Sequence, residues 1–231
     1  MRTVYIVCEG QTEEKFIKDV FIPHFNFEQK DIYITPFCSK TSICNNKVHK
    51  GGGLSYSKIK QEVLNLLRRQ DNPYVTTMFD YYALDTNFPG HNQLNAIPDI
   101  YKKVKHLEEK FKDDINSIFS NNRFFPYIQP HEFESLLFSD INEIVKADPD
   151  WNQRATLISS LSAIVNQCPN PEEINNSYNT SPSHRLSKIL NSPKYRKVLH
   201  GATIAKNIGI ENIRQKCKHF DEWCNNKNLF P

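Results

Sequence analysis

The stretch that decides the fold is Thr3-Val4-Tyr5-Ile6-Val7-Cys8-Glu9-Gly10-Gln11-Thr12-Glu13-Glu14. Its apolar, β-branched run at residues 4–8 predicts a strand that is buried on both faces. Glu9 and Gly10 end this strand in a turn, and a helical pattern begins at Thr12 with acidic residues in its first turn, where the helix dipole favours them. The stretch therefore predicts a carboxylate at the carboxyl end of a parallel strand, where open α/β sheets bind ligands.

Two interpretations of Glu9 follow from this position. Neither a glycine-rich phosphate loop nor a nucleophile elbow follows the strand, so those two kinds of site are excluded here. A lone carboxylate at a strand end suits a hard cation with oxygen ligands, such as Mg²⁺. It equally suits a turn carboxylate that caps the next helix, and this stretch alone does not separate the two.

Composition narrows the class of protein. The chain has 231 residues, enough for one large domain or a core with an appendage, and its formal net charge of +3 excludes a strongly basic nucleic-acid surface while leaving a local basic patch open. Its six cysteines form no C-x-x-C pair, which predicts reduced thiols and no zinc ribbon. No run approaches the roughly 20 apolar residues of a membrane span, and the N-terminus leads directly into a strand. We therefore expect no signal peptide, no membrane contact and a cytoplasmic location.

Three more strands are predicted, at residues 31–37, 75–79 and 123–128. Helical patterns at residues 12–25, 57–69 and 97–119 separate them, and Pro23 predicts a kink or an early end of the first. Beyond Ser139 only short helical pieces appear, at residues 152–166, 171–175, 184–190, 201–208 and 211–224. We predict an α/β fold with a mainly parallel, Rossmann-like sheet of four strands flanked by helices over residues 1–138. A helical C-terminal section, residues 139–231, is predicted to pack on this core.

Further acidic residues follow the other strands. Asp80 ends the third strand as Glu9 ends the first, so in adjacent parallel strands both carboxylates emerge at one edge. Glu132 and Glu134 follow the fourth strand, in a segment predicted to be helical over residues 129–138. Within a helix, positions i and i+2 point roughly 200° apart. Both therefore reach one metal only where the chain is still turning, and otherwise one of them supports the fold.

Several acids at one edge repel one another and raise one another's pKa unless a cation compensates. This argues for Mg²⁺ or Mn²⁺, which activates water and stabilises the charge that develops during phosphoryl chemistry. His131 is a candidate general acid or phosphate-orienting residue. It is equally explained as a helix-start histidine with a hydrogen bond to solvent.

Cationic residues at two places are candidates for holding a phosphate. Lys50 precedes three glycines in a polar loop that either approaches phosphate through its backbone N–H groups or is simply a flexible connection. Arg185 and Lys188 lie near the start of a C-terminal helix and either bind phosphate or form ordinary surface salt bridges. The segment at residues 217–223 contains Cys, His and Asp without zinc spacing, and we interpret it as a helix packed on the core.

The motifs together resemble a known family. C-E-G-Q-T-E-E (8–14), M-F-D-Y-Y-A-L (78–84), I-Q-P-H-E-F-E-S-L-L-F (128–138), S-P-S-H-R-L (181–186) and C-K-H-F-D-E-W (217–223) resemble the domain of unknown function 4276 family over nearly the whole chain. That family is similar to the RloB group, found beside ATPase genes in bacterial defence islands. The first motif also resembles that of Toprim-type and OLD-like nucleases.

The resemblance implies a metal-dependent nuclease or phosphodiesterase that acts on nucleic acid, working with a nearby ATPase in anti-phage defence. Glu9 would act as general acid/base and metal ligand, and Asp80 would be the first acid of a D-x-D motif. Tyr82 stands where that motif has its second acid, which puts a two-metal site in doubt unless Glu132 or Glu134 supplies the ligand. Two alternatives stay open: a non-catalytic partner of the ATPase with a degenerate site, and a nucleotide-processing enzyme using the same metal site.

Overall fold

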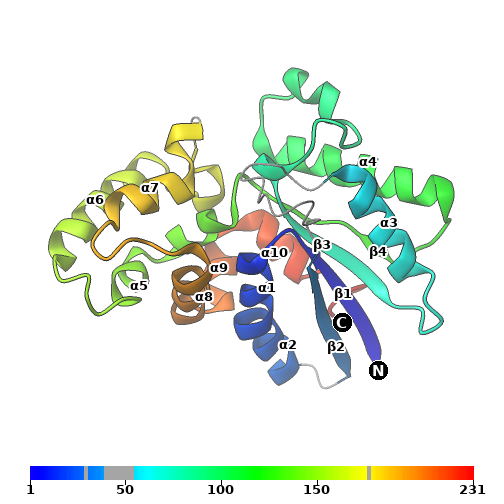
Figure 1. The fold of residues 1–231 in the computed structure, drawn as a ribbon, viewed down its shortest axis with the longest axis horizontal. Helices are drawn as coiled ribbons and strands as arrows, with labels where there is room; N and C mark the ends of the chain where they lie inside the picture. The colour runs from blue at the N-terminus through cyan, green and yellow to red at the C-terminus, as the bar shows by residue number, and fades with distance from the viewer. Residues whose placement is uncertain (29–30, 39–54, 176–177) are drawn as a thin grey trace, which may run out of the picture.

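The central sheet of the protein is parallel. The computed structural model describes residues 1–28, 31–38, 55–175 and 178–231. The strands lie in the order β2-β1-β3-β4, and β5 pairs with the end of β3 (Figure 1). They are β1 (Arg2–Cys8), β2 (Ile32–Cys38), β3 (Tyr74–Asp80), β4 (Phe124–Phe125) and β5 (Ile128–Gln129). All pairings between them are parallel, so the predicted α/β fold with a Rossmann-like sheet is confirmed. The predicted fourth strand is divided into the two short strands β4 and β5.

Side chains of β1 enter hydrophobic cores on both faces of the sheet. Val4, Ile6 and Cys8 belong to one core, whereas Val7 belongs to the other. This alternation follows from the two-residue period of a strand. Helices α1 (Gln11–Phe16) and α2 (Ile22–Glu28) lie on the first face, and α3 (Tyr56–Leu67) and α4 (Ile100–Ile118) lie on the second (Figure 1).

The first helical segment continues past Pro23. A π-helical segment, η1 (Ile17–Phe21), joins α1 to α2, and α2 runs on to Glu28. Pro23 lies in the first turn of α2, directly after the π turn. The irregularity predicted at this proline therefore takes the form of a π turn, and the helix does not end there.

After β5 the described chain is helical, and short 3-10 segments occur both there and between β3 and α4. Short 3-10 segments include η2 (Tyr81–Ala83), η3 (His91–Ala96), η4 (Phe133–Ser139), η5 (Pro171–Glu173) and η6 (Tyr178–Thr180). The α-helices are α5 (Ile141–Lys146), α6 (Arg154–Gln167), α7 (Pro182–Ile189), α8 (Lys197–Ile208), α9 (Ile210–Lys216) and α10 (Lys218–Cys224). The α-helix predicted over residues 129–138 is wrong. Strand β5 occupies its first two positions, and the 3-10 segment η4 begins only at Phe133.

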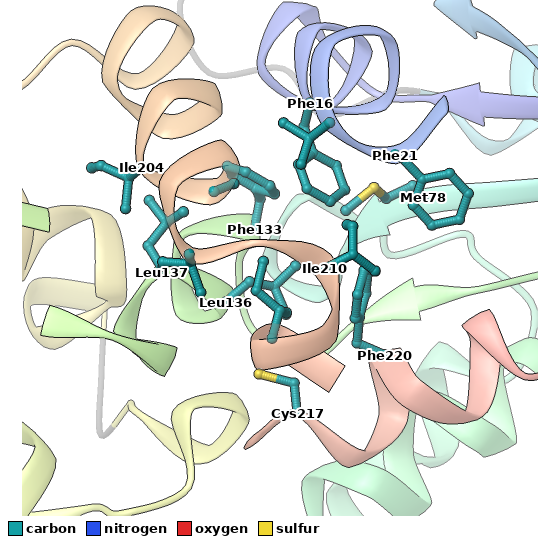
Figure 2. Close-up of a cluster of buried hydrophobic side chains, with 14 of the residues drawn as sticks. Phe16, Phe21, Met78, Phe133, Leu136, Leu137, Ile204, Ile210, Cys217 and Phe220 are labelled. Atoms are coloured by element: carbon teal, nitrogen blue, oxygen red, sulfur yellow. The ribbon is translucent and has the colours of Figure 1, made fainter. Parts of the chain in front are cut away.

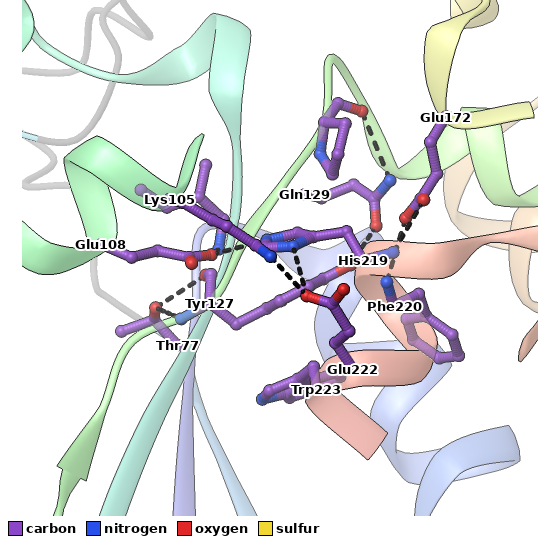
Figure 3. A network of polar contacts seen from close by, with 12 residues as sticks. Thr77, Lys105, Glu108, Tyr127, Gln129, Glu172, His219, Phe220, Glu222 and Trp223 are labelled. Atoms are coloured by element: carbon purple, nitrogen blue, oxygen red, sulfur yellow. Dashed lines mark hydrogen bonds and ion pairs between the residues drawn. The ribbon is translucent and has the colours of Figure 1, made fainter. Parts of the chain in front are cut away.

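A single helix over residues 211–224 was also predicted, but the chain forms two helices there. Glu172, distant in sequence, accepts hydrogen bonds from the backbone N–H groups of His219 and Phe220 at 2.9 and 3.0 Å (Figure 3). In a continuous helix these N–H groups would bond to carbonyls one turn earlier. The buried Glu172 carboxylate thus caps α10 and separates it from α9.

The C-terminal helices complete the core on the first face of the sheet. Figure 2 shows Phe16 and Phe21 of the first helical segment beside Phe133, Ile210 and Phe220. Helix α8 packs closely against α1 at Gly201. A Cβ atom there would lie 3.1 Å from a Phe133 ring carbon and 3.6 Å from Thr12 Cγ2. The glycine therefore permits the close approach of α8 to the Phe133 ring, whereas the distance to Thr12 is that of an ordinary van der Waals contact.

Two further findings bear on the sequence-based expectations. In the part of the chain that the structure describes, no helix is both long and apolar enough to cross a bilayer. The five cysteines in that part, Cys8, Cys38, Cys168, Cys217 and Cys224, are free thiols.

Candidate functional site

Strand register brings the first two predicted acids to one edge of the sheet. Cys8 of β1 pairs with Met78 of β3 in a parallel ladder. Glu9, the residue after β1, therefore stands beside the end of β3, where Asp80 is the last residue. Because the two strands are adjacent and parallel, both carboxylates belong to the carboxyl edge of the sheet, in the region where α/β folds place their ligands.

Three more carboxylates and one ammonium group join them. We call this group the acidic edge: Glu9, Glu13, Asp80, Glu132, Glu134 and Lys197. Burial raises the pKa of Asp80 well above its usual value, and the charges of the other four carboxylates raise it further. Glu13 lies in the first turn of α1, and its charge also raises the pKa of Glu9 and Glu134.

Two members of the acidic edge titrate near neutral pH. Burial raises the pKa of Glu9 to about 7, with a contribution from Glu13, against the opposing effects of the Asp80 backbone N–H and Lys197. Burial likewise raises the pKa of Glu134 to about 7, although Lys197 opposes it. Both carboxyls therefore change their ionisation in the neutral pH range.

Backbone donors from other segments hold three of the carboxylates. The N–H of Phe133 donates to Asp80 Oδ1 at 2.8 Å, and the N–H of Ser183 donates to Glu132 Oε2 at 2.9 Å. Glu13 Oε2 accepts from the Gly10 N–H at 3.0 Å. Each of these bonds uses one carboxylate oxygen; those of Asp80 and Glu132 come from distant segments, whereas that of Glu13 comes from the N-cap residue of its own helix.

Lys197 is the member that sequence analysis missed. Its Nζ lies 3.3 Å from Glu134 Oε1, and the Glu134 side chain is only 2% exposed. This ion pair is the polar contact that the described residues give to that buried oxygen. Burial disfavours the ammonium charge, but Glu134, Glu132 and Asp80 raise the pKa of Lys197 above its usual value. The sequence did offer one indication of this contact. A lysine in the first turn of a helix meets the positive end of the helix dipole, so its charge calls for a nearby acid.

Glu132 and Glu134 both reach the acidic edge because this segment is not an α-helix. Glu132 has an extended backbone, and Glu134 lies in the 3-10 segment η4. The condition that the chain still be turning at this point is thus met. Both charges act on Asp80, while their partners differ: a backbone N–H for Glu132 and Lys197 for Glu134.

His131 lies beside the acidic edge in a left-handed backbone conformation, with φ of 60°. Burial lowers its pKa to about 4, and Lys103 lowers it further against the opposing charge of Glu132. Its ring lies next to those of Tyr81 and Tyr82, with centroids 6.3 and 5.5 Å away. At neutral pH the imidazole is uncharged and binds a proton weakly, which favours a role in orienting substrate over that of a general acid.

Tyr82 occupies the position where a second acid of a D-x-D motif would stand. Its side chain is 42% exposed, and burial of the phenol with the charge of Glu132 raises its pKa to about 12. The phenol is neutral at physiological pH and supplies no anionic ligand there.

The predicted cationic residues do not line the acidic edge. Arg185 and Lys188 line a cavity of about 740 Å³ between α6 and α7. Arg185 Nε donates to the Thr180 carbonyl at 2.5 Å. No salt bridge of either residue is found within the described ranges, so the surface salt-bridge explanation is not supported there. Lys50 lies outside the described residues.

The chemistry of the acidic edge fits a hard divalent cation. Its donors are all carboxylate oxygens, and one ammonium group, that of Lys197 beside Glu134, opposes their negative charge. Within the described residues, however, no three His, Cys, Asp or Glu side chains are close enough together to hold a metal ion as they stand. Binding would therefore require some of these side chains to rotate.

Comparison with known proteins assigns the chain to a family. Neither the curated proteins nor the solved structures contain a match to this chain. One family model, Domain of unknown function (DUF4276), matches residues 8–226, a span that runs from the end of β1 to beyond α10. Since this match covers far more than half of the sequence, the chain belongs to the DUF4276 family.

Proposed function

We propose that the acidic edge binds Mg²⁺ or Mn²⁺ and that the protein hydrolyses phosphodiester bonds of nucleic acid. The observation that supports this most is the raised pKa, about 7, of both Glu9 and Glu134. Buried carboxylates crowded in this way are stabilised in their ionised form by a divalent cation. When bound, such an ion supplies a Lewis acid and a nucleophilic water at neutral pH.

In this proposal the side chains of the acidic edge bind the metal ion and transfer protons. Glu9, Asp80 and Glu134 hold the ion through their oxygens, and Glu132 acts as a further ligand once its side chain rotates. Glu9 titrates near pH 7, so it is also suited to accept and return a proton during hydrolysis. His131, uncharged at this pH, orients a substrate phosphate.

The biological setting is part of the same proposal. The likeness of the first motif to Toprim-type and OLD-like nucleases, and of the whole set of motifs to RloB, favours a role in bacterial anti-phage defence in the cytoplasm. An ATPase encoded nearby is the proposed partner, and nucleic acid the proposed substrate.

A specific observation favours a second candidate, a non-catalytic partner of that ATPase. Tyr82 is a neutral phenol at the position of a second acid, and no three-residue metal group is preassembled among the described side chains. In this alternative the surface formed by Tyr81, Tyr82 and His131 recognises a protein or nucleic acid through ring contacts.

A cleavage assay tests the proposal. Purified protein, alone and with the neighbouring ATPase, is incubated with single- and double-stranded DNA and RNA in Mg²⁺ or Mn²⁺. We expect cleavage that Glu9→Gln and Asp80→Asn abolish. Glu14→Gln, which removes a carboxylate paired with Lys18 outside the acidic edge, is the matched control and keeps the activity. Absence of cleavage in every combination would leave the partner role as the better account.

A further inference from the structure

We propose that the cavity between α6 and α7 binds a phosphorylated small molecule of nucleotide size. This inference is independent of the acidic edge and of the function proposed for it. The cavity has a volume of about 740 Å³, and no residue of the acidic edge lines it.

The charge of the cavity favours an anion. Helix α7 contributes His184, Arg185 and Lys188 to one wall. Among the described residues that line the cavity, Asp150 is the only acidic one. Arginine and lysine side chains presented together are the usual means of binding phosphate.

No described carboxylate neutralises the two permanent cations of this wall, Arg185 and Lys188. Arg185 is anchored by its Nε to the Thr180 carbonyl, a bond that leaves the two terminal nitrogens of the guanidinium for a ligand. In the described ranges no carboxylate pairs with Arg185 or with Lys188. Two uncompensated cations on one helix wall, three residues apart, are thus presented to the cavity.

The size and remaining lining exceed what inorganic phosphate alone requires. Pockets for small organic ligands span about 300–1,000 Å³, and this cavity lies within that range. Leu157 and Ile189 add apolar surface suited to a base, while Asn152 and Ser160 add hydrogen-bonding groups suited to a sugar or base edge. A nucleoside phosphate combines these three chemistries in one molecule.

Calorimetric titration of the full chain, without added divalent metal, tests the proposal. The probes are AMP, ADP, ATP, inorganic phosphate, adenosine and a 5′-phosphorylated oligonucleotide. We expect at least one nucleotide to bind about tenfold or more tightly than phosphate, with no binding of adenosine. Arg185→Gln and Lys188→Gln should each weaken that nucleotide about tenfold, and Lys206→Gln, an exposed lysine of α8 outside the cavity, should not.

Several results would overturn the proposal. These are absence of binding by all three nucleotides, equal affinity in the Lys188→Gln protein, or binding only of a 5′-phosphorylated oligonucleotide. If Arg185→Gln fails to fold, titration of Lys188→Gln alone tests the proposal, because Lys188 is exposed and its substitution should not affect folding. Glu9→Gln should retain nucleotide binding, so failure at the acidic edge and failure at this cavity are distinguished.

Discussion

The backbone N–H of Phe133 donates a 2.8 Å hydrogen bond to Asp80 Oδ1. This bond joins the end of β3 to the segment that follows β5. Glu132 and Glu134 flank Phe133, so the same bond sets both of them beside Asp80. A single backbone contact therefore assembles carboxylates from two distant parts of the chain.

Asp80 is predicted to have a structural role that can be separated from its charge. Asp80→Asn keeps an oxygen acceptor for the Phe133 N–H and removes only the ionisable group, so its free energy of unfolding should stay close to that of the unmodified protein. Asp80→Ala leaves the donor without a partner and should lower stability by about 1–3 kcal/mol. Urea denaturation of the two variants measures the difference. Equal stability of Asn and Ala variants would contradict the structural role.

Metal affinity is predicted to rise with pH around neutrality. Glu9 and Glu134 lose their protons as the pH passes about 7, and only the ionised carboxylates bind a cation well. Mn²⁺ binding should therefore strengthen between about pH 6 and 8 and release protons. Titration calorimetry in two buffers of different ionisation enthalpy measures this release. Affinity that does not change over this range would show that neither carboxyl is a ligand.

The same pKa shifts predict how stability without metal depends on pH. The ordinary pKa of a glutamate is 4.5, and the folded value is about 7 for both residues. Between these values the folded state binds more protons than the unfolded state, so these two groups make the free energy of unfolding fall as pH rises. Denaturation curves for Glu9→Gln should show a smaller fall than those of the unmodified protein over this interval.

Lys197 is predicted to lower the pKa of Glu9 and of Glu134. Its positive charge lowers the pKa of both Glu9 and Glu134, so Lys197→Gln should move both titration midpoints to higher pH. Carboxyl-carbon NMR of isotopically labelled protein follows the midpoints directly. Lys206→Gln removes the same charge from an exposed position on the same helix and should leave them in place. If the titration midpoints of Glu9 and Glu134 do not move in Lys197→Gln, the charge of this lysine does not act on the acidic edge.

A second polar network, between α4 and α10, predicts another pH effect. His219 Nε2 lies 2.8 Å from Glu108 Oε1, and its ring stacks on Tyr127, which stacks on Trp223 (Figure 3). Burial opposes the charge on His219, but Glu108 outweighs it and the pKa of His219 is raised. The pair therefore stabilises the fold fully below the ordinary histidine pKa of 6.5, and this contribution is lost as pH rises through the higher folded value.

Glu108→Gln tests that network. It keeps an oxygen that can accept from the Ile128 N–H but removes the charge that favours protonated His219. The variant should be less stable than the unmodified protein near pH 6, and the difference should shrink toward pH 8. Thermal or urea denaturation at both pH values measures it. A stability difference that grows with pH would contradict the assigned charge on His219.

The sheet was predictable from the sequence because a buried parallel strand is a continuous run of apolar residues. The run at residues 4–8 is apolar throughout, and its carboxyl end is marked by Glu9 and Gly10. Adjacency of β1 and β3 then sufficed to place Glu9 with Asp80. The split between α9 and α10 was not predictable, because the carboxylate that caps α10 belongs to Glu172, far away in sequence.

Only some residues of the acidic edge were predicted, again because contacts between segments distant in sequence leave no local pattern. Glu132 and Glu134 follow a strand and were found. Lys197 reaches the acidic edge through the packing of α8 against α1, and its place in the first turn of a helix does not indicate which acids it meets. Arg185 and Lys188 were assigned to the same substrate by charge alone. Their side chains line a separate cavity, because α7 meets the acidic edge through Ser183 at its start and turns these cations toward α6.

The most direct test of the central claim is calorimetric titration of Mn²⁺ into the unmodified protein, Glu9→Gln and Asp80→Asn at pH 7.5, with Glu14→Gln as the control. If the acidic edge binds a divalent cation, the unmodified protein and Glu14→Gln bind Mn²⁺ with equal affinity. Glu9→Gln and Asp80→Asn then each bind at least about tenfold more weakly while remaining folded. No binding by the unmodified protein, or equal binding by all four proteins, would contradict the claim.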